Sequence, residues 1–306
     1  MEVNKIEGTH LGQKSEYKFS YDPSLLVPVP RQENRSLINV DNRNLPFIGY
    51  DIWNCYEISC LLSNGKPFVG IAKIKYSCNS EFLVESKSLK LYLNSFNMTC
   101  IKANDEFYAK RELEEIISSD LGKVLQTVVQ VSVFGSTCTS SCDSILSDCT
   151  RMKYLRYIDF EEIVAPFSYT EDPSLLKVLP MGEDGTIIYQ SDLLRSNCKI
   201  TKQPDWGTIY IGLEYKERVL KMSNLLKYII SFRNENHFHE EICETIYKRL
   251  YDVLDIQKEG SLIVACFYTR RGGIDINPIR ASNIQMFGYF RDYLNIDRVS
   301  PKTLRQ

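Results

Sequence analysis

The sequence predicts an α+β protein made of two modules of similar topology, each an antiparallel sheet with two helices on one face. Three observations support this prediction. The order hairpin, two helices, strand can be recognised twice along the 306 residues. Asp-Pro-Ser-Leu-Leu occurs at 22–26 and again at 172–176, and Tyr-x-x-Ser-Phe occurs at 92–96 and 228–232. Because these two echoes have different offsets, we expect insertions between the modules.

The first module spans residues 1–135 and begins with an arm. Residues 1–48 are polar and interrupted by prolines, which favours an extended arm over a helix. Alternating apolar residues then predict strands around 52–60 and 68–74. Asn64-Gly65 between them is a strong hairpin signal.

Two helices and a strand complete the first module. Leu89, Tyr92, Leu93 and Phe96 fall at helical spacing and predict a helix that begins near residues 85–87. Asn104 and Asp105 cap a second expected helix, which ends near Leu125. Alternation at residues 127–134 predicts the closing strand.

Residues 136–185 are interpreted as a linker or insert. Their first part is rich in serine and threonine, which is typical of a loop. Cys138, Cys142 and Cys149 raise the question of zinc. Their spacing lacks a Cys-x-x-Cys pair, and no nearby histidine completes a tetrahedral set. We therefore expect a loop and no metal site.

The second module spans residues 186–306 and repeats the order of the first. A strand leads to Cys198, the chain turns at 203–207, and a second strand follows at 208–216. Further elements are expected as a helix at about 220–232, a helix from His239 that carries Ile242, Ile246 and Leu250, and a strand at 262–268.

Composition and charge narrow the function classes. Hydrophobic residues make up 43% and charged residues 25%, as in soluble globular proteins. The formal net charge of -2 gives no overall field that would recruit nucleic acid or an anionic membrane. The N-terminus resembles neither a signal nor a transit peptide, and no apolar run approaches the roughly 20 residues that span a bilayer. We therefore expect a cytoplasmic protein, in which the ten cysteines are reduced thiols and not a disulfide framework.

Cys198 and Asp205 form the first candidate pair for chemistry. A cysteine attacks as its thiolate, and Lys199 and Lys202 nearby would favour that form. An acid folded back by the turn can exchange a proton with the thiol. On this stretch alone, an inert cysteine on an apolar strand and a turn-forming aspartate are the more common situations.

The helix start at 236–241 supplies the second group of candidates. His237 and His239 are two of the three histidines in the chain, and histidine moves protons readily near neutral pH. Glu240 can accept two parallel N–H bonds from a cyclic amidine or guanidine edge. A solvated helix N-terminus with ordinary acidic residues is the alternative explanation.

The segment Arg270-Arg271-Gly272-Gly273 is the third candidate. Two arginines followed by two glycines let guanidinium and backbone approach an anion such as a phosphate. A charged turn at a strand end explains the same residues. The sequence has no G-x-G-x-x-G after a strand and no G-x-x-x-x-G-K-[ST], so neither a Rossmann nor a P-loop nucleotide site is supported.

Together these motifs resemble a known family. ESKSLKLYLNSFN at 85–97, SNCKITKQPDWG at 196–207, FHEE at 238–241 and RRGGIDINP at 270–278 are similar to the two-module NADPH-dependent 7-cyano-7-deazaguanine reductases. These are the nitrile reductases of queuosine biosynthesis, in the tunnelling-fold superfamily. The resemblance covers nearly the whole chain, keeps the family's motif order, and is weakest at about 136–185.

The resemblance implies a reaction and roles for three residues. Cys198 would add to the nitrile carbon to give a covalent thioimide, which two NADPH reduce to 7-aminomethyl-7-deazaguanine. Asp205 would be the general acid. His239 would assist proton delivery or orient the substrate.

Further residues are carried over by motif. The substrate-binding positions are Val84, Glu85, Ser86, His239 and Glu240. The NADPH-binding positions are Ser86, Lys87, Arg271 and Gly272, where cations facing the extra phosphate would favour NADPH over NADH. The family also implies a homodimer whose modules build a barrel, with sites at subunit interfaces. No metal, nucleic acid or membrane partner is expected.

Two alternatives stay open. A related tunnelling-fold hydrolase of the GTP cyclohydrolase type would act on a purine or pterin and would normally need a catalytic zinc, for which the ligand set here is poor. A noncatalytic module that holds a modified base or RNA is disfavoured by the balanced charge and by the intact Cys198 and Asp205 pair.

Overall fold

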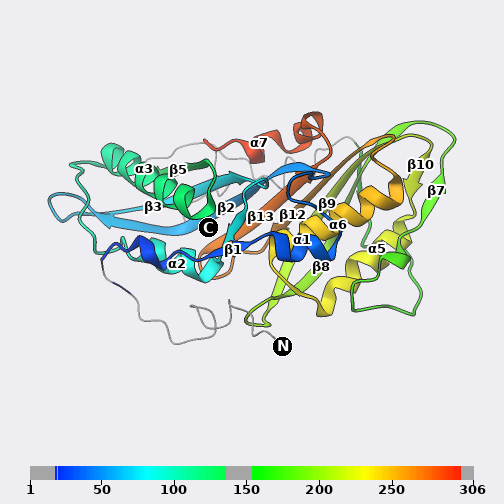
Figure 1. Ribbon diagram of the computed structural model, residues 1–306, viewed down its shortest axis with the longest axis horizontal. Coiled ribbons are helices and arrows are strands. Elements are labelled where there is room, and N and C mark those ends of the chain that lie inside the picture. Colours follow the sequence, from blue (N-terminus) through cyan, green and yellow to red (C-terminus); the bar gives the residue numbers. More distant parts are fainter. Residues whose placement is uncertain (1–17, 19, 136–153, 298–306) are drawn as a thin grey trace.

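The computed structural model describes residue 18 and residues 20–135 and 154–297. The architecture is mixed α+β, as the sequence predicts: one long sheet carries helices along its length (Figure 1). Cys138, Cys142 and Cys149 lie outside the described residues, and so does the loop expected there.

A nine-stranded sheet runs through both halves of the chain. Its main path has the order β11-β8-β9-β12-β13-β2-β3-β5, and the short β6 (Leu155–Tyr157) also pairs with β8. The strands on the main path are β2 (Ile48–Leu61), β3 (Pro67–Ser77), β5 (Val129–Gly135), β8 (Gly185–Cys198), β9 (Pro204–Tyr215), β11 (Asn236–His237), β12 (Ser261–Tyr268) and β13 (Ile274–Ala281). Antiparallel pairing of β13 with β2 joins the two halves edge to edge.

In the described part of the chain, four helices of nine or more residues lie on one face of the sheet, and the sequence predicts all four. They are α2 (Ser86–Asn94) and α3 (Glu106–Leu125) in the first half, and α5 (Met222–Ser231) and α6 (His239–Leu254) in the second. The Asp105 side chain caps α3 by accepting from Tyr108 N at 3.0 Å. Each pair packs its apolar side chains mainly against strands of its own half, and Ile274 and Ile276 of β13 join the cluster of α2 and α3. Figure 1 shows the two pairs along the sheet.

The repeated pentapeptide forms the same local structure twice. It begins the 3-10 helices η1 (Pro23–Leu25) and η2 (Pro173–Leu175), where Asp22 and Asp172 accept from the backbone N of Ser24 and Ser174 at 2.9 and 3.0 Å. A short strand follows each: β1 (Pro28–Pro30) pairs with β4 (Phe82–Val84), and β7 (Val178–Pro180) pairs with β10 (Arg218–Leu220). The two copies of the pentapeptide therefore have matching local structure, although the second copy lies within residues 136–185, which are interpreted from the sequence as a linker or insert.

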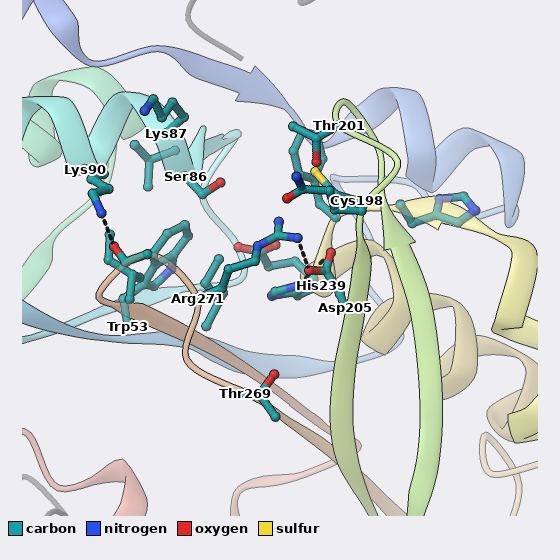
Figure 2. A pocket seen from close by; sticks show the side chains of 18 residues that line it. Trp53, Ser86, Lys87, Lys90, Cys198, Thr201, Asp205, His239, Thr269 and Arg271 are labelled. Carbon is teal, nitrogen blue, oxygen red and sulfur yellow. Dashed lines mark hydrogen bonds and ion pairs between the residues drawn. The ribbon is translucent and has the colours of Figure 1, made fainter. Parts of the chain in front are cut away.

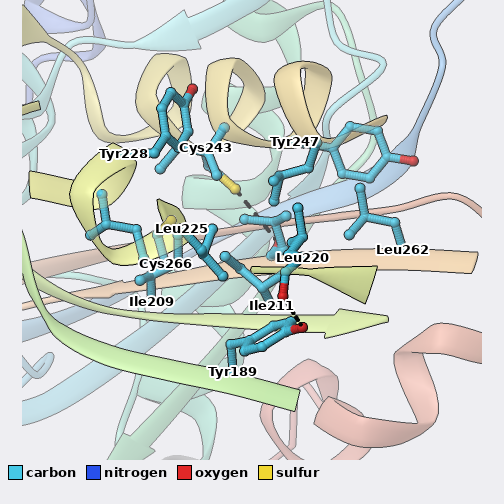
Figure 3. Packing of buried hydrophobic residues seen from close by; sticks show 14 of the residues in the cluster. Tyr189, Ile209, Ile211, Leu220, Leu225, Tyr228, Cys243, Tyr247, Leu262 and Cys266 are labelled. Atoms are coloured by element: carbon cyan, nitrogen blue, oxygen red, sulfur yellow. Dashed lines mark hydrogen bonds between the residues drawn. The ribbon is translucent and has the colours of Figure 1, made fainter. Parts of the chain in front are cut away.

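The three largest apolar clusters of the described residues hold the layers together. One lies under α2 and α3, and a second lies under α5 and α6, where Leu225, Cys243 and Tyr247 pack onto Ile211 and Leu262 of the sheet (Figure 3). The third covers the opposite face of the sheet with η4 (Ile284–Phe290) and α7 (Arg291–Leu294). Within the described residues, no helix combines the length and the apolar character needed to cross a membrane.

The structure differs from the sequence prediction at three places. The arm contains the helix α1 (Gln32–Leu37) instead of being extended throughout. The turn after Cys198 lies at residues 199–203, so Asp205 belongs to β9 and not to the turn. Lys202 adopts the left-handed region (φ 58°) and donates from its backbone N to Cys198 O at 3.0 Å, which closes the hairpin earlier than expected. Strand β13 was not predicted, because polar residues and a proline interrupt its alternation.

Candidate active site

A pocket of about 350 Å³ lies where the two halves meet. The β8–β9 hairpin, the start of α6, the start of α2 and the turn between β12 and β13 surround it (Figure 2). The sequence-predicted residues that line it are Val84, Ser86, Lys87, Cys198, Asp205, His239, Glu240, Arg271 and Gly272. Motifs up to about 190 residues apart in the chain are therefore brought together.

Cys198 is the last residue of β8 and lies at the edge of the pocket, with 6% of its surface exposed. Its backbone N donates to Gln203 O at 2.8 Å, and it pairs with His237 of β11, which brings the start of α6 beside the thiol. The two nearby lysines are engaged elsewhere. Lys199 Nζ pairs with Glu241 Oε1 at 2.8 Å, and Lys202 Nζ donates to Lys199 O at 2.9 Å. The expectation that these ammonium groups activate the thiol gains no support.

Asp205 lies one strand away from Cys198 and is equally buried, at 6% exposure. Its two carboxylate oxygens have different partners. Oδ1 is 2.8 Å from Arg271 Nη1, and Oδ2 is 3.3 Å from His239 Nε2. Acid, imidazole and guanidinium thus form one contact chain on the pocket wall (Figure 2). The imidazole in turn lies flat against the ring of Tyr268.

Glu240 is a buried carboxyl on the first turn of α6, with 3% of its surface exposed. Burial, followed by the nearby Asp51 carboxylate, raises the pKa of Glu240 to about 8, although Arg31 acts in the opposite direction. Its Oε1 atom has no hydrogen-bond partner within the described ranges. A ligand that offers N–H donors would relieve this cost.

Glu85 is the predicted residue that does not line the pocket. Its carboxylate caps α2, accepting from Lys87 N at 2.8 Å and from Ser88 N at 2.7 Å. Burial raises the pKa of Glu85, and those backbone hydrogen bonds oppose the shift. The neighbours Val84 and Ser86 do reach the pocket. A direct role of Glu85 in binding stays a prediction, and in this structure its carboxylate orders the start of α2.

Cations line the remaining rim of the pocket. Lys87 comes from α2, and Arg271 comes from the turn between β12 and β13 (Figure 2). Lys90, which the sequence reading missed, also lines the pocket and donates from Nζ to Gly272 O at 2.6 Å. Gly272 and Gly273 have φ of 61° and 80°, a region that glycine reaches without strain. Lys90 could have been predicted from the sequence, because it lies three residues after Lys87 and therefore on the same face of the helix.

An apolar wall formed by Trp53, Ile274 and Ile276 completes the pocket. None of the three is a predicted site residue. They come from β2 and β13, which are neighbours in the sheet, and Trp53 pairs directly with Ile276. No local motif marks them, because strand pairing across more than 200 residues creates the wall.

These features define the class of protein: an α+β enzyme whose pocket combines a thiol, an acid, an imidazole and a cationic rim. Comparison with known proteins identifies the family. The family model described as "Nitrile reductase, 7-cyano-7-deazaguanine-reductase N-term" matches residues 17–133, and that of "QueF-like protein" matches residues 204–286. The chain belongs to the family of NADPH-dependent 7-cyano-7-deazaguanine reductases.

Curated relatives with that name align over almost their full length. The protein from Colwellia psychrerythraea is 39% identical over 92% of this chain and 94% of its own. The proteins from Rickettsia typhi and Hahella chejuensis are 43% and 40% identical, over 89% and 92% of this chain and 92% and 95% of their own. A solved structure titled as the apo form of archaeosine synthase QueF-Like overlaps 33% of this chain and 96% of its own, at 14% identity and a TM-score of 0.28. An overlap of that quality does not define a shared fold.

Proposed function

We propose that this protein reduces the nitrile of 7-cyano-7-deazaguanine to the aminomethyl group of 7-aminomethyl-7-deazaguanine with NADPH, a step of queuosine biosynthesis. The shared name of the relatives supports the reaction and the reductant. One observation carries the proposal: Cys198 and Asp205 line one pocket with Glu240 and the cation Arg271. A nucleophile, a proton source, a ring acceptor and an anion-binding cation are the groups that this reaction requires.

Cys198 is the proposed nucleophile. Its sulfur forms a bond to the nitrile carbon while one C–N π bond breaks, and the nitrile nitrogen takes up a proton, which gives a thioimide. The contact between Asp205 and His239 Nε2 supports this pair as the source of that proton. Addition converts an inert triple bond into a C=N bond that can be reduced.

Glu240 is the proposed acceptor for the deazaguanine ring. The ring edge carries two parallel N–H groups, and a carboxylate accepts such a pair with good geometry. The unpartnered Oε1 and the raised pKa of Glu240 support this role, since bonding to N–H donors stabilises the ionised form that burial disfavours. The backbone of Val84 and Ser86 on the opposite wall is the proposed second contact.

The residues of the cationic rim fit NADPH. Lys87, Lys90 and Arg271 offer positive charge for its phosphates, and Arg271, 43% exposed, is accessible. A Cβ at Gly272 would lie 3.3 Å from Lys90 Nζ, so glycine there leaves room for the lysine against the turn. When bound, NADPH supplies the reducing equivalents, two molecules for the four electrons that separate a nitrile from an amine. Lys87 and Arg271 are the proposed contacts for the extra phosphate.

The proposal includes a homodimer. We expect two tandem tunnelling-fold modules, 1–135 and 186–306 joined by 136–185, to assemble with a second copy into a barrel. The open sheet supports this: among the described strands, β5 has a neighbour on only one side. A cytoplasmic location and the lack of a nucleic-acid or membrane partner are part of the same proposal. The described cysteines are free thiols, which suits a reducing compartment.

The test is intact-mass analysis of protein mixed with 7-cyano-7-deazaguanine, followed by addition of NADPH with absorbance recorded. We expect a covalent adduct without NADPH, which disappears as two NADPH are oxidised for each base. Cys198→Ala should form no adduct, whereas Cys100→Ala, which removes an exposed thiol, should react like the wild type. An adduct retained in Cys198→Ala would refute the nucleophile.

The zinc content of the same sample distinguishes the nitrile reductase from the hydrolase alternative. In the described ranges no three His, Cys, Asp or Glu side chains are grouped so as to hold a metal ion, so no observation favours a zinc-dependent hydrolase. Stoichiometric zinc together with no adduct and no NADPH oxidation would overturn the nitrile reductase proposal.

A further inference from the structure

The imidazole of His239 lies flat on the phenol ring of Tyr268. Their ring centroids are 3.7 Å apart and their planes differ by 5°. The next shortest ring separation in the described part of the chain, between Phe267 and Tyr293, is 4.5 Å. A parallel stack at this distance fixes the plane of the imidazole, because rotation of the ring would press it into its neighbour.

The position of Tyr268 is fixed by its strand and by its neighbours in the sheet. It lies on β12, and its backbone N donates to Asn277 Oδ1 at 3.1 Å. Its partner across the sheet is Gly207 of β9. A Cβ at Gly207 would lie 3.2 Å from Cδ1 and 3.3 Å from Cε1 of the Tyr268 ring. Because residue 207 is a glycine, the Tyr268 ring has room to pack against the face of the His239 imidazole.

The ring of Tyr268, and not its hydroxyl, is the part that acts on His239. The hydroxyl is buried and has no hydrogen-bond partner anywhere in the described chain. Burial raises the pKa of Tyr268 well above its ordinary value, so the phenol stays protonated. A phenylalanine would present the same face to the imidazole without the unpaired hydroxyl.

Among the described residues, His239 has no partner for the hydrogen bond that usually orients a histidine in an active site. Such an imidazole is commonly held by an acceptor on the nitrogen that faces away from the chemistry. Nδ1 of His239 is buried, and the described residues offer it no such acceptor. Its other nitrogen, Nε2, is 3.3 Å from Asp205 Oδ2. The stack on Tyr268 thus sets the plane of the imidazole, and within that plane Nε2 meets Asp205 (Figure 2 shows the His239 and Asp205 side).

From this geometry we infer that Tyr268 is a positioning residue: its ring replaces the missing hydrogen bond and holds the His239 imidazole in line with Asp205. Gly207 contributes to the same positioning, because the absence of a side chain there leaves space for the Tyr268 ring. This role presupposes the proposed reaction, in which His239 and Asp205 deliver the proton.

The first measurement does not depend on activity. Protons above the face of an aromatic ring resonate upfield, so the imidazole protons of His239 should be shifted upfield relative to those of His237, which stacks on no ring in the described residues. His239→Asn assigns the signals. The upfield shift should persist in Tyr268→Phe and disappear in Tyr268→Leu. An unshifted His239 in the wild type, or a shift unchanged by leucine, would overturn the stack.

The second measurement is steady-state reduction of 7-cyano-7-deazaguanine. Tyr268→Leu should lower kcat by roughly tenfold or more with little change in the KM for the base, because proton delivery and not ring binding is disturbed. Tyr268→Phe should stay within about threefold of the wild type. Gly207→Ala keeps the tyrosine but crowds its ring, and should lower kcat in the same direction; this variant decides the matter if the leucine protein does not fold.

The two failures are distinguishable. If the wild-type protein does not reduce the nitrile, the proposed function fails, and the NMR comparison still decides the stack. If the wild type is active and Tyr268→Leu and Gly207→Ala both keep full kcat, the proposed function stands and the positioning role is refuted.

Discussion

Glu240 and Glu241 are adjacent on the first turn of α6, yet their surroundings shift their pKa values in opposite directions. Burial and the Asp51 carboxylate raise the pKa of Glu240 to about 8. Burial would also raise that of Glu241, but the hydrogen bond with His237 and the charge of Lys199 lower it below its ordinary value. The ionised Glu241 carboxylate therefore stabilises the folded protein, whereas the ionised Glu240 carboxylate destabilises it.

The sign of the Glu240 effect follows from linkage. A folded-state pKa above the unfolded value means that the folded protein binds the extra proton, so stability falls as pH rises from about 4.5 to about 8. Glu240→Gln removes this loss. We expect its free energy of unfolding to exceed that of the wild type by several kcal/mol above pH 8, at about 1.4 kcal/mol for each pH unit between the two pKa values, and the gain to vanish near pH 4. Urea denaturation at several pH values measures it.

The neighbouring Glu241 is the matched control. Its lowered pKa stabilises the fold above the unfolded value of about 4.5, and this contribution is lost as pH falls. Glu241→Gln should therefore be less stable than the wild type at pH 8. The account is wrong if both glutamine variants change stability with the same sign there.

The turn between β12 and β13 contributes Arg271 to the cationic rim, and its glycines adopt backbone conformations that other residues reach only with strain. Gly273 has φ of 80°, and a Cβ there would lie 2.4 Å from Cδ of Glu57. Glu57 in turn is 3.4 Å from Lys90 Nζ, which donates to Gly272 O. A side chain at Gly273 would therefore disturb the lysine and the turn together.

Gly273→Ala should separate backbone strain from this contact. Gly65 in the first hairpin has φ of 81° and open space around its Cβ position, so Gly65→Ala supplies the same strain alone. Both variants should lose about 1 kcal/mol of stability. Only Gly273→Ala should raise the KM for NADPH, by roughly threefold or more, because the rim cations shift. Equal KM values in the two variants would disprove the link between this turn and the cofactor.

Elements with local signals were predictable, and those defined by distant pairing were not. The structure confirms the elements whose signals come from residues close together in the sequence: the hairpin at Asn64-Gly65, the helix capped by Asp105, and the helices α2 and α6 with their apolar spacing. Strand β13 was not predicted, because its polar residues resemble a turn in the sequence. It is defined by pairing with β2 and β12, which are distant or separate segments. The catalytic candidates come from short motifs, whereas Trp53 and Lys90 enter the pocket through tertiary packing.

At the scale of the whole molecule, a buried ionic cluster ties the arm, both halves of the sheet and α6 together. Glu244 of α6 lies at its centre, with Arg35 Nη2 at 2.7 Å and Arg280 Nη2 at 2.8 Å. Asp51 pairs with Arg280 at 2.8 Å and also with Arg31. Three guanidinium groups thus face two carboxylates. Glu240, close enough to interact with Asp51, is a third.

No sequence pattern predicts this ionic cluster. Arg35 and Glu244 are 209 positions apart, and each alone is typical of a solvated helix face. Only the fold removes them from water, and the arginines then lower the pKa of Glu244 to about 2 against the effect of burial. The carboxylate therefore stabilises the fold above pH 4.5, and this contribution is lost as pH falls toward 2.

Glu244→Gln should be strongly destabilising because it leaves three buried guanidinium groups with Asp51 as the nearest ionised partner. Breaking a buried pair from one side costs on the order of 3 kcal/mol or more at neutral pH. The difference from the wild type should shrink between pH 4.5 and pH 2, where protonation removes the same charge from the wild type. Glu115→Gln, at an exposed position on α3, should change stability by less than about 0.5 kcal/mol.

The two tryptophans of the chain can report on the halves separately, since Trp53 lies on β2 and Trp206 on β9. Single-tryptophan proteins made by Trp53→Phe and Trp206→Phe should unfold in urea with coincident transitions, because the continuous sheet and the ionic cluster couple the halves. With Glu244→Gln added, the two transitions should separate, and that of Trp206 should move to lower urea because α6 loses its anchor to the arm. Coincident transitions at an unchanged midpoint would mean that strand pairing between β13 and β2 alone joins the halves, and that the cluster contributes nothing to their coupling.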